Sequence, residues 1–344
     1  MSDKKFPFVS VVVCTFNRGD NINPSIESLL KQTYPKDRYE IIVVDDGSTD
    51  VTKKINPREG VKIIRHEINR GIPTARNTGL AAAKGEIVAY IDDDAIADPD
   101  WLKCLMEPFD DPKVTGSGGR TFAYKTDHLA ERYQAAGESG NPAPLTFGKS
   151  KNPFWRFWAY IKSMFVPVGI ATQPTEVQAI FGLNCAYRVS ALRSAGGFDE
   201  KLFAEEDSEL CVRLRNAGAH IMFEPSAIIH HRHRESVVQL IRQTYRRSQY
   251  TVYYYSKVKK FLPIFPLPLI YLVGAIYLLI VQPIVGILFI FISPLILYSW
   301  WSIRAVYKHD LEYMVYGYIQ LALESAAILG MARGKLFGTE HRVV

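Results

Sequence analysis

The chain has 344 residues, of which 48% are hydrophobic and 22% charged, and its formal net charge is +6. This composition excludes a globally disordered chain, and the mild positive charge suits anionic partners such as nucleotides, phosphates or an acidic membrane surface. The four cysteines lie far apart without a C-x-x-C pair. This spacing argues against a zinc site or a disulfide framework and favours a reduced, cytosol-facing setting.

Four short apolar runs in the first hundred residues predict the strands of one sheet. They are residues 9–16, 39–46, 61–66 and 86–94. Continuous apolar runs are typical of strands buried on both faces, as in a parallel sheet covered by helices. Between them we expect helices over 21–32, with Asp20 or Asn21 as N-cap, and over 72–84, with Gly85 as C-cap. The alternation of strands and helices indicates an α/β fold with right-handed crossovers.

Polar residues stand at the ends of three of these predicted strands. They are Thr15 and Asn17 at the end of the first, Asp45 and Asp46 at the end of the second, and Asp92, Asp93 and Asp94 at the end of the fourth. Ligands bind at the carboxyl ends of the strands in open α/β sheets, so these side chains should converge on one cleft. A lone acid there is often a helix N-cap. Three adjacent carboxylates, however, are tolerated only where a cation or a hydrogen-bond donor neutralises them.

A second acidic group stands in AEEDSELCVRLRNAG, residues 204–218, which reads as a helix that ends at Gly218. Compensation of the helix dipole would by itself explain acids in the first turn. The helical period nevertheless places Asp207 on the apolar face, Glu206 at its edge and Glu205 outward. An acid on a buried stripe needs a further role, which makes Asp207 the candidate of interest.

No Asp, Glu, Lys or Arg occurs from 261 to 303. Because about 20 helical residues cross a ~30 Å hydrocarbon core, we expect two transmembrane helices over about 261–281 and 284–303, joined by a tight turn at Gln282. Basic residues flank both ends, so both ends should be cytoplasmic. Residues 311–331 are apolar but contain acids. We expect them to form an interfacial helix, with a third span as the alternative.

Six segments are each weak signals alone, but their common order and spacing are specific for one protein family. They are SVVVCTFNR, VVDDGSTD, NRGIPTARNTGLAAAKGE, YIDDDAIADPDWL, FGLNCAYR and GGFDEKLFAEEDSELCVRLRNAG. With them, about residues 7–250 resemble the inverting family 2 glycosyltransferases, which have a GT-A fold. The resemblance implies a Rossmann-like, mostly parallel sheet flanked by helices.

The expected domain organisation follows from this resemblance and from the apolar segment. Residues 1–235 should form the GT-A domain and 236–260 an amphipathic linker helix. The two transmembrane helices should lie within 261–303, and 304–344 should hold the interfacial or third membrane helix and a cytoplasmic tail. The aromatic and basic cluster at 153–165 is expected to lie at the acceptor side as an interfacial helix or as a packed lid.

The resemblance implies a divalent cation, Mg²⁺ or Mn²⁺, which stabilises the leaving diphosphate as a Lewis acid. The D-x-D element of the family falls on Asp92 and Asp94. A histidine after the last strand often completes this site, and the H-x-H-R register favours His231 over its neighbours His230 and His233.

The resemblance also implies the residues that bind the nucleotide sugar. They are Thr15, Asn17, Asp45, Asp46, Arg76, Asp92, Asp93, Asn184 and Arg246. Arg246 stands in RQTYRRS, which is similar to the Q-x-x-R-W element of processive synthases but lacks its Trp, so processive polymerisation is doubtful. The E-D element falls on Glu206 and Asp207. We expect Asp207 to act as the general base, with Glu206 as the alternative.

The implied function is inverting, metal-dependent hexosyl transfer from a UDP- or GDP-type nucleotide sugar. The expected acceptor is a lipid-linked or membrane-associated glycan at the cytoplasmic face of a membrane. We expect a multi-pass membrane protein that contacts membrane lipid. We expect no nucleic acid partner. One alternative is a polyprenyl-phosphate monosaccharide synthase, although DDDAIADPD differs from the D-A-D and Leu-Gln of such enzymes. A second is an inactive nucleotide-binding scaffold, but no acid of the D-x-D or E-D elements is lost.

Overall fold

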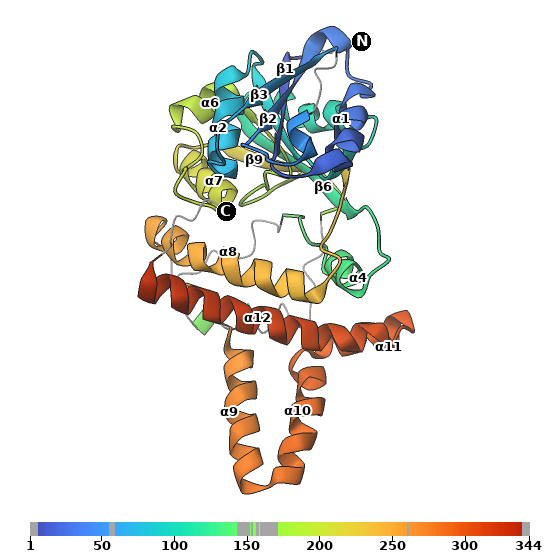
Figure 1. Ribbon diagram of the computed structural model, residues 1–344, viewed down its shortest axis with the longest axis vertical. Coiled ribbons are helices and arrows are strands. Elements are labelled where there is room, and N and C mark those ends of the chain that lie inside the picture. Colours follow the sequence, from blue (N-terminus) through green and yellow to red (C-terminus); the bar gives the residue numbers. More distant parts are fainter. Residues whose placement is uncertain are drawn as a thin grey trace.

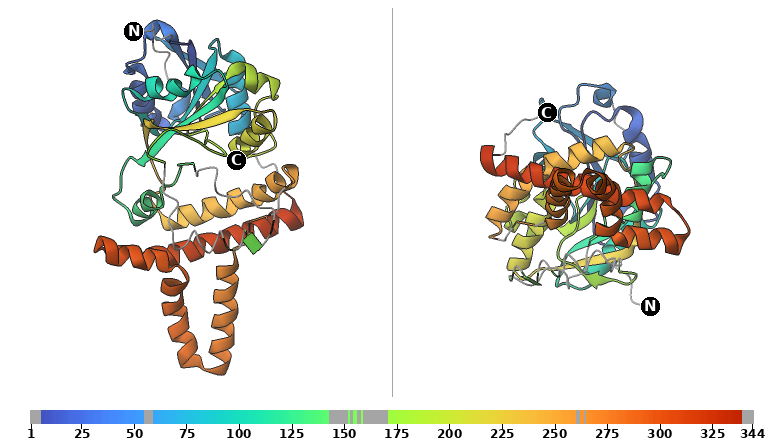
Figure 2. Two further views of the ribbon diagram at one scale, coloured as in Figure 1. Left: turned by 180° about the vertical axis from the view of Figure 1, so that it is seen from behind. Right: turned by 90° about the horizontal axis from the view of Figure 1, so that it is seen from below.

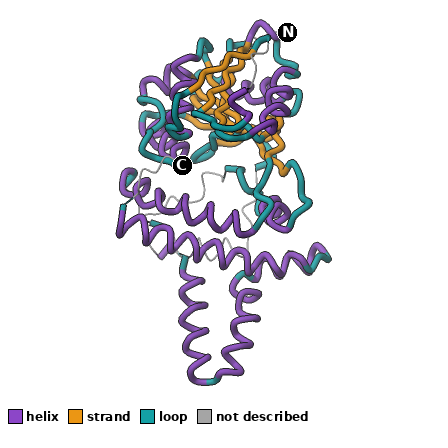
Figure 3. The backbone as a smooth tube through the Cα atoms, in the orientation of Figure 1, coloured by secondary structure: helices purple, strands orange, loops and turns teal. Residues whose placement is uncertain are grey.

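The chain folds into a sheet domain and a helical part that lie one above the other (Figure 1). The computed structural model describes residues 6–54, 59–142, 152, 154–155, 158, 171–259, 262–263 and 265–338. All strands of the described part belong to the upper domain, and the lower part is helical (Figure 3). The cluster predicted at 153–165 lies almost entirely outside the described residues.

The first four strands form the parallel half of the sheet, as the apolar runs predict. They are β1 (Val9–Thr15), β2 (Tyr39–Asp45), β3 (Val61–Arg65) and β4 (Ile87–Asp92). β1 lies between β2 and β4, and β3 pairs with the outer side of β2. The register places Asp45 beside Thr15 and Asp92 beside Cys14, so the polar residues after these strands lie at one edge.

The second half of the sheet mixes directions and was not predicted from the sequence. Its strands are β5 (Ala95–Ala97), β6 (Val114–Ala123), β7 (Thr175–Glu176), β8 (Asn184–Arg188) and β9 (His220–His231). The order across the sheet is β3-β2-β1-β4-β8-β6-β9-β5, with β7 on β9. β8 is antiparallel to β4 and β6, and β5 is antiparallel to β9.

Helices cover both faces of the sheet and bury its alternating side chains. The helices of this domain are α1 (Asn23–Leu30), α2 (Ile72–Ala82), α3 (Trp101–Met106), α4 (Leu129–Ala136), α6 (Val189–Ser194) and α7 (Glu206–Asn216). Short 3-10 helices are η1 (Gly19–Ile22), η2 (Lys36–Arg38), η3 (Val51–Lys54) and η4 (Glu107–Asp110). Val11 and Val13 of β1 pack into one core and Val12 into the other. This division explains why the strand is apolar throughout.

Two predicted helix caps are wrong. α1 follows directly on η1, so its N-cap is Ile22, without a side-chain hydrogen bond, and not Asp20 or Asn21. α2 ends before Ala83, whose extended backbone already leaves the helix. Gly85 serves a close approach instead, since a Cβ there would come within 2.6–2.7 Å of backbone atoms of β1, β4 and the residue before β1.

The lower part contains a layer of two long helices and a hairpin that projects from it (Figures 1 and 2). Its helices are α8 (Val237–Lys257), α9 (Pro266–Val281), α10 (Pro283–Leu297), α11 (Ser299–Lys308) and α12 (Glu312–Phe337). α9 and α10 form the hairpin, which turns at Gln282 as predicted. α8 and α12 lie side by side, across the direction of the hairpin.

The apolar helices are shorter than the predicted spans over 261–281 and 284–303. α9 has 16 residues and α10 has 15. α10 is followed by α11 after a bend of 71°, at which the buried Tyr298 donates a hydrogen bond of 2.8 Å to Glu324 of α12. Among the helices of the described part, only α12 is long and apolar enough to cross a membrane unaided. α10 and α11 meet the same criterion only when they are taken together as one bent segment. The predicted pair of spans, and with it a multi-pass arrangement, is therefore not supported.

The contact between α8 and α12 depends on small residues. A Cβ at Gly330 would lie 2.3 Å from the backbone oxygen of Tyr245, and one at Gly334 would lie 2.4 Å from that of Gln249. Because these distances are far below van der Waals contact, only glycine lets the two backbones approach this closely. Arg333 lies between the two glycines and donates a hydrogen bond of 2.6 Å to Gln249 Oε1.

We predict that Gly330→Leu separates the two helices. Overpacking of this kind costs about 1–3 kcal/mol, so the Tm should fall by several degrees. Thermal unfolding followed by circular dichroism measures the change. Ala332→Leu, at an exposed position on the same helix, is the matched control and should leave the Tm unchanged. Equal Tm values for the two variants would contradict the close contact.

Candidate active site

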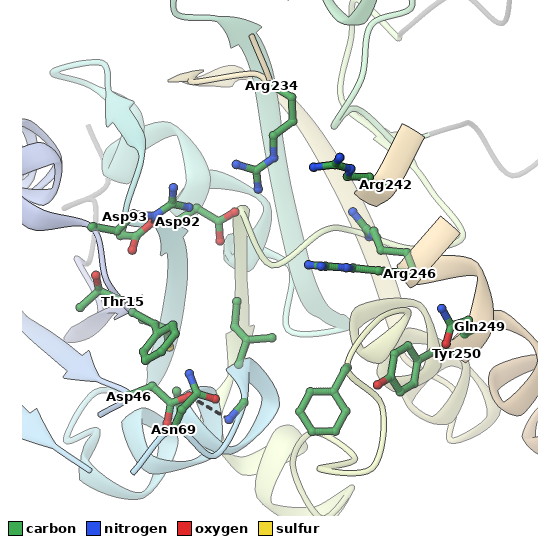
Figure 4. A pocket seen from close by; sticks show the side chains of 18 of the residues that line it. Thr15, Asp46, Asn69, Asp92, Asp93, Arg234, Arg242, Arg246, Gln249 and Tyr250 are labelled. Carbon is green, nitrogen blue, oxygen red and sulfur yellow. Dashed lines mark hydrogen bonds and ion pairs between the residues drawn. The ribbon is translucent and has the colours of Figure 1, made fainter. Parts of the chain in front are cut away.

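A cavity of about 970 Å³ lies at the carboxyl ends of β1 and β4, between the sheet domain and α8. Figure 4 shows acids and polar groups on the sheet side, among them Thr15, Asp46 and Asp92. On the opposite side α8 presents arginines, such as Arg242 and Arg246. The cavity thus has an acidic wall and a basic wall.

One residue of the acidic wall, Asp92, belongs to a group of side chains with the spacing of a metal site, whose other members, Asp94 and His231, do not line the cavity. Potential ligand atoms of Asp92, Asp94 and His231 all lie within 4.8 Å of one another. The register of β5 against β9 sets Ala95 opposite His231 and so brings the histidine to the acids. His231 Nε2 lies 3.0 Å from Asp94 Oδ1 and 3.8 Å from Asp92 Oδ2.

The neighbouring histidines do not belong to this group. His230 Nε2 lies 3.1 Å from Asp98 Oδ1, and its ring stacks on Phe122. Burial and the neighbouring His231 lower the pKa of His233 to about 4, so it is neutral near pH 7. Of the three histidines that the sequence left open, the structure therefore brings His231 to the acids.

The charge states of the group suit a divalent cation. Burial alone would raise the pKa of Asp94, but His231 and Arg18 outweigh it and lower that pKa to about 2. Burial and the Asp94 charge raise the pKa of Asp92. The group supplies two carboxylates, which are ligands of both Mg²⁺ and Mn²⁺, with an imidazole within 4.8 Å of them. The donor set therefore fits the metal that the resemblance implies.

Arg18 is a site residue that the sequence reasoning missed. Its Nε lies 2.8 Å from Asp93 Oδ1 and its Nη2 lies 2.8 Å from Asp94 Oδ2. Burial raises the pKa of Asp93 to about 7, and Arg18 opposes that rise. The ion pair between Arg18 and Asp93 gives Asp93 a structural role, which is to hold Arg18 beside the cavity. The position of Arg18 just after β1 was the available signal.

A buried arginine joins the metal-type group to the acids of α7. Arg76, from α2, is 4% exposed. Its Nη1 lies 2.6 Å from Glu206 Oε1 and 3.3 Å from Asp207 Oδ1, and its Nη2 lies 3.8 Å from Asp92 Oδ1. The backbone N–H of Gly182 donates a hydrogen bond of 2.7 Å to Asp207 Oδ2. Arg76 is absent from the residues that line the cavity, so it acts behind the wall.

The two acids of α7 differ in proton affinity. Burial and the adjacent Asp207 charge raise the pKa of Glu206. Burial would also raise the pKa of Asp207, but Arg76 and the Gly182 N–H outweigh it and lower that pKa. Near pH 7 the pair therefore holds an ionised Asp207, the form that accepts a proton.

The helical-wheel expectation for these acids needs a correction. Glu206 is the more buried side chain of the two, at 8% exposure against 14% for Asp207. α7 begins at Glu206, so the first-turn side chains follow the contacts with Arg76 and not the apolar stripe. Glu205 has a left-handed backbone with φ of 67° and precedes the helix as its N-cap.

Asp46 and Asp45 have different surroundings. Asp46 lines the cavity, and its carboxylate accepts hydrogen bonds of 2.9 and 2.8 Å from the backbone N–H groups of Arg70 and Gly71. Asp45 accepts one of 3.0 Å from the Ser48 N–H and does not line the cavity. The acids after β2 therefore hold the loops around the cavity, and Asp46 also faces it.

Asn17 and Asn184 lie outside the cavity lining. Asn17 accepts a hydrogen bond of 2.8 Å from the Thr49 N–H and so joins the loops after β1 and β2. Asn184 is buried, accepts one of 2.8 Å from the Trp101 indole and donates to Ala227 O at 3.2 Å. Both contacts support the site from behind. Their role toward a ligand stays a prediction.

The basic wall is larger than the sequence suggested. Arg242, Arg246 and Arg247 of α8 and Arg333 of α12 form it, while two further arginines that line the cavity, Arg18 and Arg234, follow β1 and β9 on the sheet side. Arg242 and Arg246 are four residues apart on α8, so they share one face of that helix. Only Arg246 was among the predicted ligands. Guanidinium groups bind phosphate oxygens in bidentate geometry, so the wall suits a diphosphate.

Comparison with known proteins agrees with this geometry. Residues 10–193 match the model of a family described as Glycosyl transferase family 2. The pre-mycofactocin glycosyltransferase of Mycobacterium tuberculosis is 29% identical over 230 residues, which is 66% of this chain and 43% of that protein. The glucosyl-dolichyl phosphate glucuronosyltransferase of Haloferax volcanii is 25% identical over 65% of this chain and 69% of that protein. The chain thus spans less than half of the mycobacterial relative.

A solved structure shares the fold. It is the mannosyltransferase PcManGT from Pyrobaculum calidifontis in complex with GDP-Man and Mn²⁺. It superimposes with a TM-score of 0.58 at 20% identity and covers 95% of this chain and 88% of that one. The GT-A architecture is therefore confirmed, and because the family model matches more than half of the sequence, this chain belongs to glycosyl transferase family 2.

Proposed function

We propose that the chain transfers a hexose, with inversion, from a UDP- or GDP-sugar to a lipid-linked glycan at the cytoplasmic face of a membrane. The observation that carries this proposal is the cavity with an acidic wall that fits a metal and a wall of arginines opposite it. Two relatives with named activities support the class of acceptor. The Haloferax and Methanococcus voltae proteins are named as enzymes that act on sugar-bearing dolichyl phosphates.

The donor would occupy the space between the two walls. Asp92, Asp94 and His231 would hold a divalent metal, which when bound supplies a Lewis acid for the leaving diphosphate. The arginines of α8 lie opposite and can bind the phosphate oxygens. Asp46 and Thr15 line the remainder of the acidic wall, where the nucleoside would be held.

Asp207 would accept the proton of the acceptor hydroxyl as it attacks the anomeric carbon opposite the diphosphate. Arg76 and the Gly182 N–H keep the Asp207 carboxylate ionised and oriented. Arg76 also lies 3.8 Å from Asp92, so one guanidinium would couple the charge of the base to that of the metal ligands. We therefore assign Arg76 a positioning role.

The hairpin would insert into the membrane from the cytoplasmic side. Its outer surface is apolar, and near its tip Ile280 and Ile284 are 77% and 78% exposed. At ~1.5 Å per residue, α9 and α10 reach about 24 Å, which is less than a ~30 Å hydrocarbon core. We infer a re-entrant hairpin, with α8 and α12 lying at the membrane surface and residues 1–235 above it as the catalytic domain.

The metal and base assignments predict different defects. Asp94→Asn should weaken metal-dependent donor binding at least tenfold, since it removes a ligand charge, and it should lower transfer with it. Asp207→Asn should leave the donor Kd within about twofold and lower kcat by about 10²–10⁴. Calorimetric donor binding and single-turnover transfer measure the two effects. Asp98→Asn, a nearby acid outside the group, is the control, and full transfer by Asp207→Asn would sink the base assignment.

The raised pKa of Glu206 predicts a pH dependence of stability. The folded chain keeps a proton there that the unfolded chain releases, so Glu206 contributes stability below its unfolded pKa and loses it as pH rises to the folded value. Glu206→Gln has no proton to lose. Its Tm should therefore fall less between about pH 5 and pH 8 than that of the wild type. Parallel Tm profiles for the two proteins would show that Glu206 is not the protonated acid.

The hairpin proposal predicts membrane binding that depends on its tip. The double change Ile280→Asp and Ile284→Asp should reduce co-flotation with anionic liposomes at least tenfold, because charges are costly in hydrocarbon. Val51→Asp, at an exposed apolar position of the sheet domain, is the control and should float like the wild type. Equal flotation of the tip variant and the control would contradict the proposal that the hairpin inserts into the membrane.

A further inference from the structure

A second cavity, of about 710 Å³, lies among α4, α8, α11 and α12. Its lining includes Glu205 and Arg247 on the side of the sheet domain. It also includes Phe265, directly before α9, and Tyr298, directly after α10, which are the two ends of the hairpin. The cavity therefore occupies the layer between the catalytic domain and the hairpin.

The two cavities are neighbours at Arg247, whose charge helps to lower the pKa of Asp207, although Glu206 and Asp207 themselves line neither cavity. Arg247 lines both of them. Glu205 directly precedes Glu206 and Asp207, and its left-handed backbone, with φ of 67°, is a conformation that a glutamate rarely adopts. Glu205 makes no side-chain capping bond to α7, so capping does not explain this backbone. Strained residues of this kind cluster at ligand sites, and Glu205 places the lining of the second cavity two residues from Asp207 in the chain.

The lining of the second cavity is polar and aromatic. Gln243, Thr244 and Ser248 of α8 and Trp300 of α11 belong to it. Trp301 also belongs to it, and its indole Nε1 is buried without a hydrogen-bond partner in the described part of the chain. An indole nitrogen only donates, and a buried donor without an acceptor is costly. The cavity thus offers a prepared donor to an oxygen-rich ligand.

This chemistry separates two kinds of acceptor. A bare polyprenyl phosphate would bring one phosphate on an apolar chain and would leave the amide and hydroxyl groups of this cavity unused. A saccharide brings hydroxyl oxygens for those groups and a C–H face for the indole of Trp300. The volume of about 710 Å³ is within the range of small-molecule sites and leaves room for more than a phosphate.

Resting on the proposed function, we propose that the second cavity is the acceptor site and that it binds the saccharide of a sugar-bearing lipid phosphate. The reacting hydroxyl lies at the Glu205 and Arg247 side, next to Asp207. The lipid leaves at the side of Phe265 and Tyr298 and continues along the hairpin. The acceptor is therefore a lipid that already carries a sugar.

The first test fills the cavity. Thr244→Trp places an indole in the second cavity at a position that does not line the first. Transfer to a polyprenyl diphosphate that carries one N-acetylhexosamine should fall at least tenfold, with hydrolysis of the donor in the absence of acceptor within twofold of the wild type. Val238→Trp, on an exposed position of the same helix, is the matched control and should behave as wild type in both assays.

The second test removes the indole N–H. Trp301→Phe keeps an aromatic ring but loses this donor, so the acceptor KM should rise about fivefold to tenfold with kcat unchanged. Because Trp301 is buried, the smaller ring lowers the Tm in either case, and the acceptor KM is the deciding measurement. A purely structural role of Trp301 would shift the Tm and leave the acceptor KM as it is.

The outcomes separate the two proposals. If the wild type neither hydrolyses nor transfers the sugar of any UDP- or GDP-sugar, the proposed function fails and this inference with it. If it hydrolyses one, but Thr244→Trp transfers as well as Val238→Trp, only the acceptor site fails. Transfer by the wild type to polyprenyl phosphate, and not to the sugar-bearing diphosphate, would overturn the assignment of a saccharide.

Discussion

The site depends on one buried guanidinium. Arg76 comes from α2, and the acids around it come from the end of β4 and the start of α7, so its ion pairs join three separate elements. A buried cation is stable only with acidic partners, and the acids in turn need the cation. Gly182 makes room for it, because a Cβ there would lie 2.1 Å from Arg76 Nη2. Arg76, Gly182 and the α7 acids therefore form one interdependent unit.

The same logic of compensated charge explains the acid triplet after β4. Asp92 is balanced by Arg76 and His231, Asp93 by Arg18, and Asp94 by both His231 and Arg18. The repulsion within the triplet is thus divided among Arg76, Arg18 and, when it is protonated, His231, which come from different elements. A divalent metal adds charge where two of these carboxylates and the imidazole meet, which is why the arrangement suits a ligand that arrives with its own phosphates.

Local sequence signals predicted the parts of the structure that local physics determines. The apolar runs located β1 to β4 and the acids at their ends, because a strand buried on both faces is apolar along its length. Long-range contacts determined the rest. The register of β5 on β9 selected His231, the glycine contacts of α12 brought Arg333 to the cavity, and the bond between Tyr298 and Glu324 ended α10 early.

α8 lies between the two cavities, and its helical geometry assigns one face to the donor and another to the acceptor. At 3.6 residues per turn, positions two apart differ by about 200°, so Arg242 and Arg246 face one way and Thr244 and Ser248 face the other. The first pair lines the donor cavity and the second pair lines the second cavity, with Arg247 shared by both. One helix can thus hold a diphosphate on one side and an acceptor on the other. Its packing on α12, next to the hairpin, would then set how far the catalytic acids stand from the lipid.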